Sequence, residues 1–108
     1  MSSADLRKKF GVILGALALG VSAHAAAAPP SRLGLCAACH GQHGIAAAPA
    51  MPNLAGQNLD YLRAAMRQYR SGARDVAAMR AASEMLTPAQ LEDVLVWYSQ
   101  QRVPGPAP

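Results

Sequence analysis

The sequence lacks several patterns from which a fold or an activity is usually inferred. No run of β-branched residues appears in its 108 residues, which argues against a buried β-strand, and no internal repeat is present. No basic run is interleaved with aromatic residues, so nucleic-acid binding has no support. The sequence also pairs no nucleophile with a base, and we therefore expect a protein that is not an enzyme and takes no small-molecule substrate.

Long apolar runs are scarce as well, and the longest one lies near the N-terminus. A basic segment at 7–9 precedes an apolar stretch over 10–21 and a small-x-small cleavage site at 23–25. The stretch has about a dozen residues, whereas a membrane-spanning helix needs about 20. This pattern predicts a cleaved secretory signal peptide over residues 1–25 and a mature domain over 26–108, exported to the periplasm. An uncleaved membrane anchor is the alternative, since the alanines after the cleavage site could lengthen the apolar stretch.

The mature domain is only weakly basic. The whole chain has a formal net charge of +4, and loss of the signal peptide removes three basic residues and one acidic residue, which leaves +2. The basic residues of the central part of the chain favour a solvated helix face, and a weak docking patch for an acidic redox partner is the alternative. These central basic residues are Arg63, Arg67, Arg70, Arg74 and Arg80.

Cysteine is rare too, and the two cysteines of the chain stand three positions apart, in Cys36-Ala-Ala-Cys39-His40. Residues three apart share one face of a helical turn, so both sulfurs can meet one edge of a planar macrocycle and form thioethers with it. His40 follows directly and can bind iron through its imidazole. The pattern is typical of the attachment site of a c-type haem, and it predicts one covalently bound haem c held by Cys36, Cys39 and His40.

Three other interpretations of this motif are weaker. A thioredoxin-like redox pair needs a preceding strand and a following long helix, and the sequence has no candidate strand. A zinc site formed by Cys36, Cys39, His40 and His43 would take four ligands from eight residues and close almost no chain. A simple disulfide would leave the adjacent histidine unexplained.

The first part of the mature domain predicts a short helix and a loop. Pro29 and Pro30 block any helix before Ser31, which can act as the N-cap of a helix over 32–40. The segment 41–56 is rich in glycine, alanine and proline and has no helical period, so it is predicted to be a loop.

The second part contains clearer helix signals. Asn58 or the preceding glutamine can cap a helix with an apolar stripe, and Gly72 is a plausible stop. The alanine-rich segment 73–84 is ambiguous. Residues 87–90 (Thr-Pro-Ala-Gln) form a capping box that starts a last helix, which we expect to end at Pro104. The count is three or four helices and no strand, hence an all-α fold.

A second axial iron ligand is needed opposite His40, and a methionine is the natural choice for an electron carrier. Met66 belongs to the apolar stripe of a helix, and Met51 shares the loop that follows the haem motif. Met79 and Met85 both lie far enough along the chain to reach the opposite side of the haem, and position alone does not separate them.

From Cys36 to Tyr98 the sequence resembles a class I monohaem cytochrome c of the small soluble bacterial, cytochrome c-553-like kind. This resemblance implies an all-α fold of three to four helices wrapped around one covalently attached haem. The matching segments, in the order of the family, are 36–41, Gly44, 52–57, 61–62, 72–74, Met79, 86–91 and 97–98.

The resemblance also implies roles for single residues. In the family the axial methionine follows a Gly-x-Arg element by a few residues and precedes the last helix by about seven, which fits Met79 and makes Met85 the fallback. The carbonyl of Pro52 should accept a hydrogen bond from the ring of His40 and fix its tautomer. Weaker candidates, for contacts with the haem propionates, are Gln57, Tyr61 and Arg74.

One departure from the family concerns the first helix, which usually begins several residues earlier. Here Pro29 and Pro30 truncate it, so the crossing with the last helix must be smaller, and Gly34 could permit a close approach.

These observations predict a periplasmic one-electron carrier between redox-protein donors and acceptors, monomeric, with haem iron held by His40 and Met79. The alternative is a haem c electron-transfer subunit of a larger dehydrogenase or oxidase complex, and a membrane-bound enzyme of that kind is a possible partner.

Overall fold

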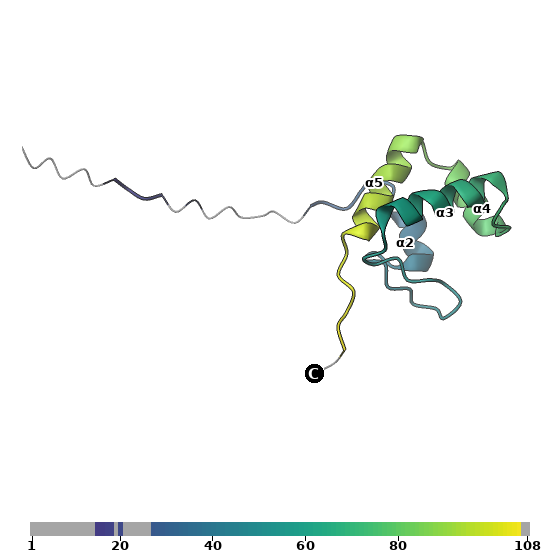
Figure 1. Cartoon of the computed structure of the whole chain (residues 1–108), viewed down its shortest axis with the longest axis horizontal. Helices are drawn as coiled ribbons and strands as arrows, with labels where there is room; N and C mark the ends of the chain where they lie inside the picture. The colour runs from purple at the N-terminus through teal and green to yellow at the C-terminus, as the bar shows by residue number, and fades with distance from the viewer. Residues whose placement is uncertain (1–14, 19, 21–26, 107–108) are drawn as a thin grey trace, which may run out of the picture.

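The computed structural model describes residues 15–18, 20 and 27–106, and within them it is all-helical (Figure 1). Its helices are α2 (Gly34–His40), α3 (Leu59–Ser71), α4 (Ala77–Glu84) and α5 (Pro88–Ser99), and these residues contain no strand. The predicted all-α class is therefore confirmed. Most of the predicted signal peptide, residues 1–25, lies outside the described residues. In the part that is described, no helix is both long and apolar enough to cross a bilayer.

The strong helix signals act as predicted. Asn58 caps α3 by accepting a hydrogen bond from the Tyr61 amide at 3.0 Å. Gly72 ends this helix in the left-handed conformation, with φ +83°. Thr87 and Gln90 form a reciprocal capping box at the start of α5, and Pro88 occupies its first turn. The ambiguous segment 73–84 contains α4.

Two predicted helix ends are wrong. Ser31 is not an N-cap, because residues 31–33 form a turn in which the Leu33 amide donates to the Pro30 carbonyl at 3.0 Å. The last helix ends at Ser99 and does not reach Pro104. Near this end, the Tyr98 carbonyl accepts hydrogen bonds from the Gln101 amide at 3.2 Å and from the distant Gly56 amide at 3.0 Å.

The core forms where α3 and α5 pack together and where the turn before α2 meets them. Tyr98 is completely buried and Val94 nearly so, and they are joined by Leu33, Leu62 and Leu95. Burial of each such side chain contributes roughly 1.5–3 kcal/mol relative to leaving it exposed. The expected close crossing at Gly34 is not present, because this glycine is exposed and an added Cβ would meet nothing within 4 Å.

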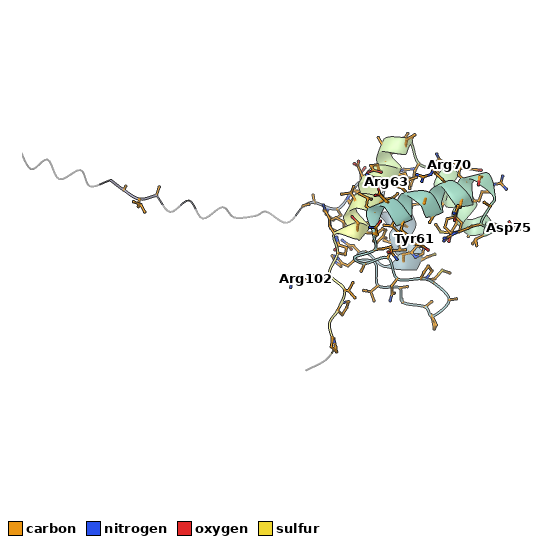
Figure 2. The ribbon with its side chains drawn as sticks, viewed as in Figure 1. Tyr61, Arg63, Arg70, Asp75 and Arg102 are labelled. Carbon is orange, nitrogen blue, oxygen red and sulfur yellow. The ribbon has the colours of Figure 1, made fainter. Side chains whose placement is uncertain are left out.

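α3 is the central element of the described domain, since it packs against both α4 and α5. Its two sides differ in character. The labelled Arg63 and Arg70 lie along one side of α3 and Tyr61 along the other (Figure 2). Arg63 and Arg70 are seven positions apart and so share a side of the helix, whereas Tyr61 and Arg63 are two positions apart and do not.

Candidate functional site

Cys36, Cys39 and His40 all lie on α2. Both cysteines are free thiols, one half-buried and one exposed, three residues apart on one helical face. Burial raises the pKa of the Cys36 thiol above its ordinary value. A redox-active thiol pair instead needs a nucleophilic cysteine whose pKa is lowered. The structure therefore does not support the thioredoxin-like interpretation.

His40 is the last residue of α2 and is buried, with 6% of its surface exposed. Its Nδ1 lies 2.9 Å from the Pro52 carbonyl oxygen. A carbonyl can only accept, so Nδ1 carries the proton and donates it. In the neutral ring with this tautomer, Nε2 carries the lone pair that can bind a metal.

The loop 41–56 is folded so that Pro52 reaches His40. The carbonyl of Gly44 accepts hydrogen bonds from the amides of Leu54 at 2.7 Å and Ala55 at 3.0 Å. Gly44 is buried with φ +78°, and a Cβ added there would lie 2.5 Å from the Ala55 nitrogen. Only glycine fits at this position without strain.

The segment after His40 is also tied to α5. The Tyr98 hydroxyl donates to the Gly41 carbonyl at 2.9 Å, and the Trp97 indole donates to the Gln42 carbonyl at 2.7 Å. The family resemblance over 97–98 assigned no hydrogen bonds to these two aromatics. The available signal was general: the polar tip of a buried tyrosine or tryptophan usually finds a partner.

His43 is engaged away from His40. Its Nδ1 lies 3.0 Å from the Gln101 side-chain oxygen, and its ring centroid is 6.0 Å from that of Trp97. Among the described residues, no three histidine, cysteine or acidic side chains converge on a common point. The zinc interpretation therefore has no ligand set.

The methionines occupy different environments. Met79 is half-buried within α4, whereas Met85 lies directly after the end of α4 with 56% of its surface exposed. Met66 is half-buried on α3 and lines a groove between α3 and α5, and Met51 is exposed in the loop 41–56.

Of the three candidates for propionate contacts, the structure brings two together. Arg74 Nη2 donates to the Tyr61 hydroxyl at 3.3 Å, and its guanidinium carbon lies 5.5 Å from the centre of the Tyr61 ring. The Gln57 side chain instead accepts from the Asn58 amide at 2.8 Å, at the start of α3.

The donor set on α2 fits a covalently attached haem. Two free thiols share a helical face, and a buried imidazole beside them has its Nε2 available. This combination supplies two thioether positions and one axial iron ligand from five consecutive residues.

Comparisons with known proteins identify the family of the chain. The family described as Cytochrome c matches residues 33–100. The chain is 38% identical over 79 residues to cytochrome c-554(548) of Halomonas halodenitrificans, an alignment that covers 70% of this chain and 95% of that protein.

Two longer relatives match over part of their length. Identity is 34% over 90 residues with cytochrome c4 of Pseudomonas aeruginosa, covering 83% of this chain and 45% of that protein. Identity is 39% over 97 residues with the thiosulfate dehydrogenase electron acceptor of Thiomonas intermedia, covering 88% of this chain and 44% of that protein. The chain thus spans less than half of these two relatives. It belongs to the cytochrome c family, as a class I monohaem c-type cytochrome that carries one covalently attached haem c with its iron.

Proposed function

We propose that this chain is a periplasmic one-electron carrier between redox proteins, and that it is not an enzyme. Members of its family are electron carriers. The observation that carries the proposal is the hydrogen bond from His40 to Pro52 beside two free thiols. When bound, the haem supplies the chemistry, because its iron alternates between the ferrous and ferric states.

The proposed role of α2 is to hold the haem at three points. Cys36 and Cys39 would form the two thioethers, and His40 would bind the iron through Nε2. The hydrogen bond to the Pro52 carbonyl, at 2.9 Å, favours the tautomer with the proton on Nδ1 and orients the His40 ring. Burial of this ring keeps water away from the proposed ligand.

The proposed second axial ligand is Met79, with Met85 as the fallback. Met79 is half-buried inside a helix, which supports this choice, whereas more than half of the Met85 surface is exposed. With His40 and Met79 both in place, the iron would have no open coordination position, so a substrate could not bind there. That arrangement suits electron transfer and not catalysis.

Covalent attachment is tested by the intact mass of protein exported with the haem-attachment machinery. The wild type should exceed its polypeptide mass by one haem. Cys36→Ala and Cys39→Ala should each retain one thioether at most, and the double variant should carry no covalent haem. A double variant that still gained the mass of a haem would contradict the assignment.

The methionine ligand is tested by the visible spectrum of the ferric protein, in which thioether ligation gives a weak far-red charge-transfer band. Met79→Ala should lose this band, and Met85→Ala, six positions further along the chain, should keep it. The reverse result would assign the ligand to Met85. A band that survives in both variants would exclude both methionines as the ligand.

A second candidate function is that of a haem c subunit in a larger dehydrogenase or oxidase complex. The relative named as an electron acceptor of thiosulfate dehydrogenase favours a dehydrogenase as donor. Gel filtration of native periplasmic extract separates the two functions. A free carrier elutes at the size of a single small domain, and a subunit elutes with its complex.

A further inference from the structure

The carboxyl end of α4 receives hydrogen bonds from arginines of two other segments. Arg70, in the last turn of α3, donates from Nη2 to the Ser83 carbonyl at 2.5 Å. Arg32, just before α2, donates from Nη2 to the Met85 carbonyl at 3.3 Å. The last carbonyls of a helix have no partner within it, and cations are favoured at this end of the helix dipole. α4 has no basic residue in its own last turn, so these arginines supply the cap from outside.

α4 needs such support because it is short. It has 8 residues, and its N-cap, Val76, provides no side-chain hydrogen bond. Helices shorter than about 12 residues are marginally stable by themselves, so the position of α4 depends on its tertiary contacts. In Figure 1, α4 lies beside the far end of α3, the element against which it packs.

Ser83 is the anchor point of this helix. It is completely buried, and its hydroxyl donates to the Arg80 carbonyl at 2.7 Å. Arg70 therefore bonds to the one α4 residue that is fully enclosed among those described. Met79 stands four residues before Ser83, one turn away on the same helical face.

We propose that Arg70 is a positioning residue for the methionine ligand: by capping α4 at Ser83 it holds Met79 in reach of the iron. This inference rests on the proposed ligation by Met79. Arg67 offers a matched comparison, because it lies on the same helix, is exposed, and forms no hydrogen bond or ion pair within the described part of the chain.

The experiment uses the ferric haem-loaded protein and imidazole as a competing ligand. The rate at which saturating imidazole abolishes the far-red band reports how often the methionine leaves the iron. Arg70→Ala should raise this rate about tenfold, because a hydrogen bond from a charged donor is lost. Arg67→Ala should stay within about twofold of the wild type. Arg70→Lys, which keeps the charge without the planar fork, should recover part of the difference.

Two results would overturn the inference. One is an equal imidazole rate in Arg70→Ala and Arg67→Ala. The other comes from guanidinium unfolding followed by the far-red band and by the far-ultraviolet helix signal. If Arg70→Ala lowers the unfolding midpoints of both signals equally, Arg70 stabilises the whole fold and not Met79 in particular. If Arg70→Ala does not accumulate, Arg70→Gln is judged by the same criteria. If Met79→Ala retains the band, Met79 is not the iron ligand and the proposed ligation fails. If only the Arg70 inference fails, Met79→Ala still loses the band, so the two failures are distinguishable.

Discussion

The Tyr98 hydroxyl donates a hydrogen bond to the Gly41 carbonyl at 2.9 Å and so joins the last helix to the residue that follows His40. Tyr98 is completely buried, and burial raises the pKa of its hydroxyl well above the ordinary value, so the group remains a donor at any physiological pH. The neighbouring Trp97 bonds to the next carbonyl, that of Gln42. Two consecutive residues of α5 thus hold the chain where it leaves the proposed iron ligand.

Tyr98→Phe should lower the free energy of unfolding of the haem-loaded protein by about 1–2 kcal/mol, because the Gly41 carbonyl loses its partner while the ring still fills the core. Denaturant unfolding measures this change. Ser71→Ala is the control, since its exposed hydroxyl donates to the Gln68 carbonyl at 3.2 Å at the surface, and it should cost less than about 0.5 kcal/mol. Equal effects of the two substitutions would contradict the structural role of the Tyr98 bond.

Gly44→Ala should destabilise the protein by about 1–3 kcal/mol, because the positive φ and the contact with the Ala55 nitrogen are both unfavourable for alanine. Gly34→Ala is the natural comparison. Gly34 begins a helix and has open space around it, so alanine there should be neutral or stabilise by up to about 1 kcal/mol. Thermal unfolding of both variants tests the pair, and a tolerated Gly44→Ala would show that the loop 41–56 can adopt another path.

The ion pair between Arg63 and Glu92 joins α3 to α5, and Arg63 Nε lies 3.1 Å from each Glu92 carboxylate oxygen. Hydrogen bonding to Arg63 lowers the pKa of the Glu92 carboxyl below its ordinary value. A lowered pKa in the folded state adds stability above the unfolded pKa, and this stability is lost as the pH falls through the folded value. Glu92→Gln should therefore be less stable than the wild type at pH 7.

The same variant should match the wild type at a pH below the folded pKa of Glu92. Urea unfolding midpoints measured across the acid range test this convergence. Glu84→Gln serves as the control, because Glu84 lies 3.9 Å from Arg80 with both side chains largely exposed, and its effect at pH 7 should be smaller than that of Glu92→Gln. A constant difference between Glu92→Gln and the wild type would indicate a contribution other than charge.

Removal of the haem should leave the mature chain largely unfolded. The core cluster of the described residues contains five buried side chains, which is little for a domain of this size. Circular dichroism of the Cys36→Ala, Cys39→Ala double variant should show less than about half of the helix signal of the haem-loaded protein. A native-like signal would mean that the helices pack without the cofactor.

The sequence by itself determined the features whose causes lie within one or two helical turns. The spacing of Cys36, Cys39 and His40 indicated the haem, and the Thr87 capping box and the Asn58 cap placed the starts of α5 and α3. Each of these signals is satisfied by residues at most four positions away, so no knowledge of the chain path is needed to read it.

The tertiary structure decided what depends on segments far apart in the chain. The Gly56 amide bonds to the Tyr98 carbonyl, the Tyr98 hydroxyl bonds to the Gly41 carbonyl, and Arg70 caps α4 at Ser83. These partners are 13 to 57 residues apart. A hydrogen bond between such residues forms only when packing brings a particular donor to a particular acceptor, and the identities of the residues alone do not specify that pairing.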